Sequence, residues 1–249
     1  MQNYASPTGA DNRPFNNLLR ILQDSDYALI APHLGGAQSG ANELLYNPGD
    51  NVEVVHFPCG PSVVSFLISS DDGREVETIL VGREGAVGGI VSSGHLPAYC
   101  RIIVKYGGPF MRLRVSYLEA AKEKSPNLRS LFARYADCLL AQVFQSTACN
   151  AIHSIEQRTA KWLIAAMERT GDYVVPLTQE QFATMLGVGR SYTSRVIQTF
   201  KAEGILETRR GSLVVRNHDA LKARACLCND SVKSHFESVL RGVYPRNEI

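Results

Sequence analysis

Four polar side chains stand near the start of one predicted helix, residues 190–203. They are Arg190, Ser191, Ser194 and Arg195. Because residues three and four positions apart are neighbours on a helix surface, all four share one side. A guanidinium can pair with O6 and N7 of guanine, which discriminates between bases by about 1–3 kcal/mol, and serine hydroxyls can donate to phosphate oxygens. The four residues are therefore predicted to read DNA bases, although any one of these arginines alone could be an ordinary surface charge.

The segment 177–205 supplies the elements that would position them. Thr178 and Gln181 fit a capping box at the start of a first helix. Gly187 suits a left-handed turn, and Gly189 is the predicted N-cap of the second helix. The opposite side of that helix holds Val196, Ile197 and Phe200. This pattern predicts a helix-turn-helix, which places its second helix in the DNA major groove. An αα-hairpin used for protein contact is the alternative.

A basic hairpin is predicted to follow. Arg209-Arg210-Gly211-Ser212 separates two short apolar runs, 205–208 and 213–216, and would form a wing on the DNA backbone. Residues 155–249 hold 14 Lys and Arg against 10 Asp and Glu, so positive charge collects in this half. The residues expected to contact the backbone are Thr178, Gln179, Lys201, Arg209 and Arg210.

A long helix is predicted before this unit, with Ser125 as N-cap, Pro126 in its first turn and an end near Ile152. It has an apolar stripe that is longer than a small domain needs. We expect the stripe to form a homodimer interface, since two-fold dimers are usual among such DNA-binding proteins. Packing against the preceding β domain is the alternative. The stripe consists of Leu128, Leu131, Phe132, Tyr135, Leu139 and Val143.

The N-terminal half is predicted to be rich in short strands, which favours an antiparallel sandwich or barrel of jelly-roll type. The predicted strands are 52–57, 62–69, 76–81, 100–106 and 110–115, and one helix is expected over 16–31. The expected organisation is a flexible tail (1–14), a β-roll domain (15–124), a dimerisation helix (125–153), a winged helix-turn-helix (154–225) and a helical C-terminal extension (226–249).

Residues 177–206, LTQEQFATMLGVGRSYTSRVIQTFKAEGIL, and the hairpin after them are similar to the winged-helix signature of the Crp/Fnr transcription regulators. HFPCGPSVVSFLISSDDGREVETILVGREGAVGG, residues 56–89, resembles that family's β-roll sensor domain. The resemblance covers about residues 15–225. It implies an α+β protein with a cyclic-nucleotide-binding-like β-roll, a long dimer helix and a winged helix-turn-helix. It also implies that Arg190 and Arg195 match the family's base-reading arginines.

The sequence departs from the family at the positions that bind cyclic nucleotides. Gly88-Gly89 stand approximately where a Gly-Glu pair holds the ribose, and 96–100 lack the phosphate-binding arginine. We therefore expect no tight cyclic-AMP binding, and no cofactor is predicted. The signal could instead be another small molecule in the β-roll, a change in the dimer helix, or the amount of protein. Ser191 stands where many members have a base-contacting glutamate, so the resemblance does not predict which DNA half-site is preferred.

Composition sets few further limits. The chain has 249 residues, 45% of them hydrophobic, and no apolar run approaches a membrane span. A cytoplasmic regulator, not an enzyme, is expected, with palindromic double-stranded DNA, a second copy of the chain and possible RNA polymerase contact as partners. The six cysteines show neither the paired CxxC spacing of zinc sites nor an iron–sulfur run, so no metal site is predicted.

Two other functions stay open. The first is a thiol, haem or metal sensor that regulates transcription, suggested by Cys138, Cys149, Cys226 and Cys228, or by His95 with Cys100 as haem ligands. The second is a cupin-like enzyme, which would need metal ligands converging in the β domain. That domain offers only His33, His56 and His95, without close pairing.

Overall fold

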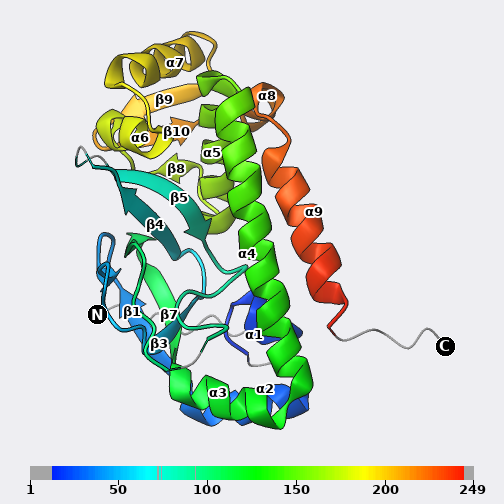
Figure 1. Ribbon diagram of the computed structural model, residues 1–249. Coiled ribbons are helices and arrows are strands. Elements are labelled where there is room, and N and C mark those ends of the chain that lie inside the picture. The colour runs from blue at the N-terminus through cyan, green and yellow to red at the C-terminus, as the bar shows by residue number, and fades with distance from the viewer. Residues whose placement is uncertain (1–12, 72, 74, 93, 244–249) are drawn as a thin grey trace, which may run out of the picture. The chain divides into compact units, whose positions relative to one another are not determined.

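The computed structural model describes residues 13–71, 73, 75–92 and 94–243 (Figure 1). The chain is a mixed α+β protein, as predicted, with antiparallel sheets first, then a long helix and then helix-turn-helix elements. It divides into two compact units. The first comprises residues up to 66, 80–140 and 235 onward, and the second comprises 67–79 and 141–234. Residues 1–12 of the predicted tail lie outside the described residues.

The N-terminal segment forms two helices where one was predicted. They are α1 (Asn17–Ile21) and α2 (Asp24–Ile30), followed by one 3₁₀ turn, η1 (Ala31–His33). Leu22 between them is extended, with ψ of 140°. Asp24 and Asp26 then stand in the first turn of α2, where carboxylates favour a helix start. The single-helix prediction was wrong because the apolar pattern is continuous across the break.

All five predicted strands are present in the β region. One sheet has the order β1-β7-β3 and another the order β2-β6-β4-β5. Two strands were missed, since β1 is glycine-rich and β2 has three residues. The bounds are β1 Gly35–Ser39, β2 Leu44–Tyr46, β3 Val54–Pro58, β4 Val63–Ser69, β5 Glu75–Val81, β6 Arg101–Tyr106 and β7 Gly108–Arg114.

Two helices follow the β region, α3 (Val115–Lys124), which was not predicted, and α4 (Pro126–Ile152), which was. Ser125 caps α4, since its Oγ accepts the Leu128 amide at 3.1 Å. None of the helices in the described part of the chain has both the length and the apolar content that a membrane span needs.

The prediction that the apolar stripe of α4 forms the dimer interface was wrong for most of the stripe. Four of its members, Leu128, Leu131, Phe132 and Tyr135, are at most 1% exposed within a single chain. The Tyr135 hydroxyl donates to the Ala86 carbonyl at 3.0 Å and accepts the Ala86 amide at 2.9 Å. These side chains fill the core of the first unit, as in the alternative interpretation, and are not available to a second subunit. The other two, Leu139 and Val143, are half-buried.

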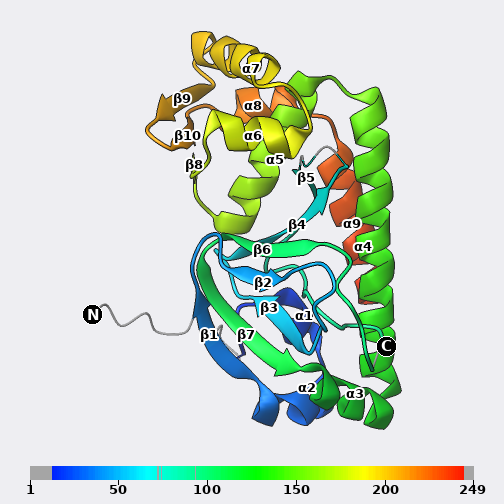
Figure 2. The same ribbon diagram turned by 60° about the vertical axis from the view of Figure 1, so that its left-hand side comes forward.

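The elements from α5 to α8 lie in the second unit, together with the start of α9, whose residues from 235 onward belong to the first unit (Figure 2). A three-stranded sheet of order β8-β10-β9 packs with helices around a core that includes Trp162, whose ring lies 5.2 Å from that of Phe182. Gly171, in the left-handed region, ends α5. The bounds are α5 Ile155–Thr170, β8 Val174–Val175, α6 Gln179–Leu186, α7 Arg190–Ala202, β9 Leu206–Arg209, β10 Ser212–Val215, α8 His218–Arg224 and α9 Cys228–Arg241.

Candidate nucleic-acid interface

Local contacts set the angle between α6 and α7. The Thr178 Oγ1 accepts the Gln181 amide at 3.1 Å, and the Gln181 side chain accepts the Thr178 amide at 2.9 Å, which is the predicted capping box. Gly187 ends α6 with φ of 65°, and Gly189 caps α7 in an extended conformation. The sequence therefore fixes both ends of the turn through residues within it.

The inward side of α7 is anchored in the core. Ile197 and Phe200 are fully buried, as is Thr193, which the apolar pattern missed. Val196, predicted to face inward, is half-buried. Arg158 of α5 donates to the Leu186 carbonyl at 2.6 Å and so satisfies the end of α6. With one side held in this way, the other side of α7 is left for solvent or a partner.

Three of the four predicted base-reading residues, Arg190, Ser191 and Arg195, are exposed on α7. Ser194 is only half-buried, and its hydroxyl donates to the side chain of Gln179 at 2.9 Å. Two residues predicted to contact DNA therefore bind each other, which joins α6 to α7. In this arrangement Ser194 holds α7 against α6. Its hydroxyl is less accessible to a binding partner than the guanidinium groups of Arg190 and Arg195 are.

Tyr192 is a surface feature that the sequence prediction of DNA contacts left out. Its side chain is 53% exposed, and the Arg195 guanidinium lies 4.4 Å from its ring centroid. A cation over an aromatic ring at an exposed site is stabilised by about 0.5–1 kcal/mol. The ring therefore restricts where the guanidinium can point. The i, i+3 spacing of an aromatic residue and an arginine was the signal available in the sequence.

The wing is tighter than predicted. Arg209 pairs with Ser212 in the β9–β10 ladder, so the turn consists of Arg210 and Gly211 alone, and Gly211 has φ of 73°. β8 adds a third strand that was not predicted. Of the expected backbone contacts, Thr178, Lys201, Arg209 and Arg210 are exposed, while Gln179 is half-buried.

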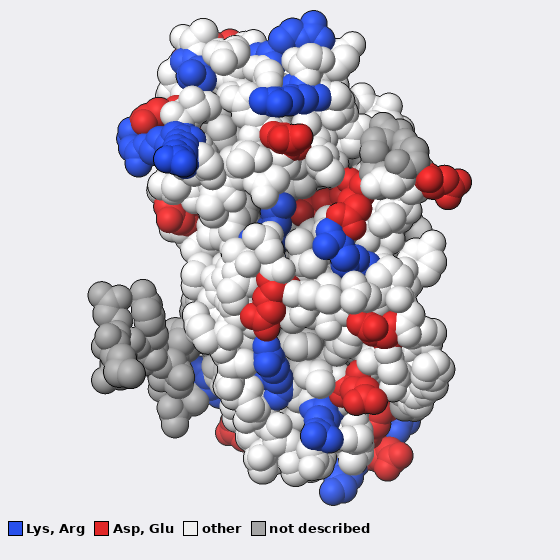
Figure 3. All heavy atoms as spheres, turned by 90° about the vertical axis from the view of Figure 1, so that its left-hand side faces the viewer, with Lys and Arg blue, Asp and Glu red and all other residues white. Residues whose placement is uncertain are grey.

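Charge on the wing is partly paired. Glu207 accepts hydrogen bonds from Arg216 Nε at 2.7 Å and Arg209 Nε at 3.1 Å, and these arginines lower the pKa of its carboxyl. Figure 3 shows lysine and arginine side chains on the part that bears α7 and the wing, with acidic side chains among them. Exposed arginines on α7 and in the wing, Arg190, Arg195 and Arg210, are side chains of the kind that a phosphate-binding surface uses.

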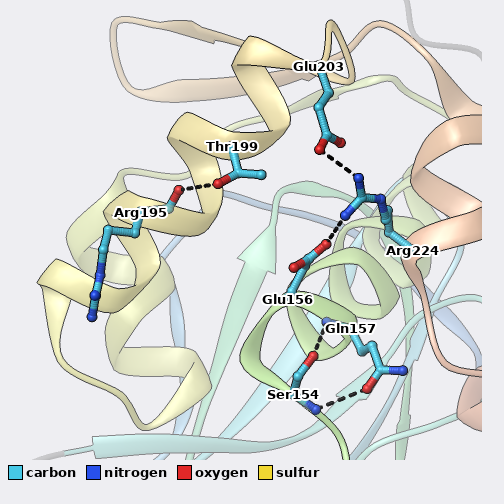
Figure 4. A network of polar contacts seen from close by, with 7 residues as sticks. All are labelled: Ser154, Glu156, Gln157, Arg195, Thr199, Glu203 and Arg224. Atoms are coloured by element: carbon cyan, nitrogen blue, oxygen red, sulfur yellow. Dashed lines mark hydrogen bonds and ion pairs between the residues drawn. The ribbon is translucent and has the colours of Figure 1, made fainter.

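An ion-pair network on a separate side of α7 joins three helices (Figure 4). Arg224 of α8 pairs with Glu156 of α5 and, at 2.6 Å, with Glu203 at the end of α7. Arg195 projects away from this network. The network joins the helices of this unit without occupying the side of α7 that bears Arg190 and Arg195.

Residues 157–224 match the family model described as a Crp-like helix-turn-helix domain. The chain carries a Crp-like helix-turn-helix domain. No curated protein sequence matches the chain significantly.

Solved structures are similar to the chain over more than the matched domain. A Crp/Fnr-family regulator from Eubacterium rectale is 18% identical, with a TM-score of 0.64 over 84% of this chain and 97% of that one. FixK2 from Bradyrhizobium japonicum is 17% identical, with a TM-score of 0.65 over 78% and 98%. TTHB099 of Thermus thermophilus is 15% identical, with a TM-score of 0.64 over 76% and 95%. The chain thus has the fold of these solved structures of Crp/Fnr-type regulators.

The residues that suggested the enzyme and haem alternatives do not converge in the β region. His56 is buried, and burial lowers its pKa to about 4. The His33 ring stacks on Tyr117 with centroids 3.9 Å apart. His95 is exposed, whereas Cys100 is buried. Within the described residues, the one group of three or more close metal-ligand side chains lies in the second unit.

The thiols behind the redox alternative fall into different surroundings. Cys138 is fully buried, which raises the pKa of its thiol to about 11, and the same holds for Cys59. A thiol of such high pKa stays protonated near neutral pH and reacts slowly. Cys149, Cys226 and Cys228 instead lie together, with His153, a residue that the sequence analysis did not consider.

Proposed function

We propose that the protein is a sequence-specific transcription regulator that binds palindromic DNA as a homodimer in the cytoplasm, with α7 in the major groove. The observation that supports it most directly is the side of α7 that bears Arg190, Ser191 and Arg195, exposed while the opposite side is anchored. Arginines near the start of the second helix are where this motif contacts base edges. Lys201, Arg209 and Arg210 would add contacts to the phosphate backbone.

Dimerisation would use the exposed side of α4 in place of the predicted stripe. Exposed residues follow one another along α4 at alternating intervals of four and three, the spacing of a coiled-coil seam. Leu140, 52% exposed, and Phe144, 64% exposed, are the large apolar side chains on it. The seam comprises Ala133, Asp137, Leu140, Phe144, Thr147 and Ala151. Two parallel copies would present two α7 helices to half-sites about 34 Å apart.

The β-roll would respond to a signal other than cyclic AMP. A Cβ at Gly89, close to where a ribose-binding glutamate stands in relatives that bind cyclic nucleotides, would lie 2.9 Å from Cγ2 of Val115. Such a side chain would require the Val115 side chain to shift. One structural relative, CLP of Xanthomonas campestris, is described as responsive to c-di-GMP, so effectors vary among proteins of this fold. Contact with RNA polymerase after DNA binding belongs to the same proposal.

The proposal is tested by selecting duplexes from a random DNA library with the full-length protein and then measuring affinity by fluorescence anisotropy. Enriched sites should be palindromic, and binding should weaken steeply with salt because phosphate contacts release counterions. Arg195→Ala should lower affinity for the selected duplex by at least about 10-fold, the value of one bidentate base contact. Lys222→Ala, an exposed charge on α8, is the matched control and should change affinity by less than about twofold.

Two results would contradict the proposal. One is a library from which no sequence is enriched at low salt. The other is equal loss of affinity in the Arg195 and Lys222 variants, since that would reduce binding to non-specific charge attraction.

A further inference from the structure

Four potential metal ligands meet in the second unit, at a place that the DNA-binding proposal does not use. The Cys149, Cys226 and Cys228 sulfurs and a His153 ring nitrogen all lie within 4.8 Å of one another. Cys149 is on the last turn of α4, and His153 directly follows that helix. Cys226 lies between α8 and α9, and Cys228 is the first residue of α9. Two helix junctions that are far apart in sequence therefore contribute one pair of ligands each.

The distances match the edges of a metal tetrahedron. The sulfurs of Cys149 and Cys226 are 3.7 Å apart, and the Cys228 sulfur is 3.6 Å from Nδ1 of His153. Ligands about 2.3 Å (sulfur) and 2.0–2.1 Å (nitrogen) from a tetrahedral zinc ion lie about 3.5–3.8 Å from each other. A disulfide would instead need about 2.05 Å between sulfurs. The four side chains are thus spaced to bind one metal ion.

Ligand chemistry selects the metal. Three sulfurs and one imidazole suit zinc, whereas magnesium and calcium prefer oxygen ligands. No carboxylate belongs to the group. Cys149 is fully buried and Cys228 is 5% exposed, so thiolates here would need a cation to balance their charge.

Surrounding contacts suit a metal-bound thiolate. Gln145, one turn before Cys149 on α4, donates from Nε2 to the Cys228 sulfur at 3.1 Å. Hydrogen bonds to ligand sulfurs orient them and stabilise their negative charge. Asn229 donates to the Lys161 carbonyl at 2.9 Å, which ties the start of α9 to α5. The ligands are therefore held by elements with contacts of their own.

The sequence does contain the motif, in a form that a search for CxxC pairs overlooks. Cys149 and His153 stand at i, i+4, the spacing that brings two ligands to one face of a helix. Cys226 and Cys228 stand two apart at a helix start. Each pair alone is weak, and only the fold joins them.

We propose that Cys149, His153, Cys226 and Cys228 bind one Zn²⁺ in a four-coordinate structural site. The ion would fasten the α8–α9 link to the junction between α4 and α5, beside the ion pairs of Arg224. Binding would displace the protons of the three thiols into solvent, with no change in oxidation state. This assignment does not depend on DNA binding.

The first experiment uses the reduced full-length protein. After purification without chelator, elemental analysis should find about one zinc per chain. Cobalt titrated into the chelated protein should give the intense visible bands of a tetrahedral thiolate site and saturate at one equivalent. Alkylation followed by peptide mapping should show zinc protecting Cys149, Cys226 and Cys228, while labelling of Cys59, Cys100 and Cys138 does not depend on zinc. Substoichiometric zinc with no cobalt spectrum, or protection of other thiols, would overturn the proposal.

Variants supply the second test. Cys228→Ser should abolish stoichiometric metal binding and the zinc-dependent rise in Tm, whereas Cys100→Ser, a buried thiol outside the group, should keep both. If Cys228→Ser does not fold, the alkylation map of the natural chain still decides. A Cys149–Cys226 disulfide that forms in air and leaves zinc affinity unchanged after reduction agrees with the proposal. The same disulfide in protein that binds no zinc when reduced contradicts it and assigns the pair to thiol redox chemistry.

Discussion

The helix-turn-helix and the β-roll hold their shapes by different means. In the helix-turn-helix, the start of α6 is held by two residues three positions apart, Thr178 and Gln181, and the turn after it depends on Gly187. In the β-roll, the decisive contacts join distant segments. The Asn16 side chain donates to the carbonyls of Pro58 and Gly85, 42 and 69 positions away. The first region is specified by local chemistry and the second by packing.

This difference predicts where substitutions are tolerated. A motif with locally capped helices tolerates substitution of its exposed residues without losing its fold. This suits a surface whose binding partner changes during evolution. A region joined through buried long-range contacts loses stability when one of them is removed, because the polar groups left behind have no water. Matched substitutions in the two regions should therefore have unequal effects.

The largest effect is expected for Gly88→Ala compared with Gly211→Ala. Both glycines have positive φ, 124° and 73°, so both alanines pay for an unfavourable backbone. At Gly88 the added Cβ would also overlap the Val54 carbonyl, whereas at Gly211 no atom lies within 4 Å. Urea denaturation should show a loss of about 4 kcal/mol or more for Gly88→Ala and about 1 kcal/mol for Gly211→Ala. Equal losses would contradict the close packing at Gly88.

The two sides of α4 give the next comparison. Leu131→Ala removes a fully buried side chain and should lower the free energy of unfolding by about 3 kcal/mol. Phe144→Ala removes an exposed one and should leave the helix content unchanged. Sedimentation velocity should instead show Phe144→Ala shifting the chain from dimer to monomer. A dimer unaffected by Phe144→Ala would remove α4's exposed seam from the proposal.

The difference between local capping and long-range packing also explains which features could be predicted from the sequence. The caps at Thr178, Gly187 and Gly189 were predictable because capping residues act on their immediate neighbours. The burial of Leu128 and Tyr135 was not, because an apolar stripe reveals that a helix face is covered but not which chain covers it. Strand β1 was missed since its residues pair through the backbone and have few apolar side chains.

The candidate sites divide along the same line. Helical spacing alone predicts that Arg190 and Arg195 lie on the outward side of α7, and both are exposed. The partnership of Ser194 with Gln179 could not, because it depends on the angle between two helices. The group of Cys149, His153, Cys226 and Cys228 required the fold itself.

A pH-dependent effect should come from the β-roll. His56 is buried beside Arg112, and burial first, then that arginine, lowers its pKa from 6.5 to about 4. At pH values between about 4 and 6.5, His56 is protonated in the unfolded chain but neutral in the folded chain. The stability is complete above about pH 6.5 and falls by at most about 3 kcal/mol as the pH drops toward 4. Urea midpoints measured across this range should fall less steeply for His56→Gln than for the natural chain; equal slopes would contradict the assignment.

The smallest effect compares an exposed tyrosine in each region. Tyr192 holds the Arg195 guanidinium on its ring, so Tyr192→Ala should weaken binding to the selected duplex by about two- to fivefold, the worth of an exposed cation–π contact. Folding stability should hardly change, since over half of the side chain is exposed. Tyr117→Ala, which removes a ring stacked on His33 in the β region, should leave DNA affinity unchanged. In the Arg195→Ala background Tyr192→Ala should have no further effect. An additive loss would instead mean that Tyr192 contacts DNA itself, and anisotropy titrations of the double variant separate the two roles.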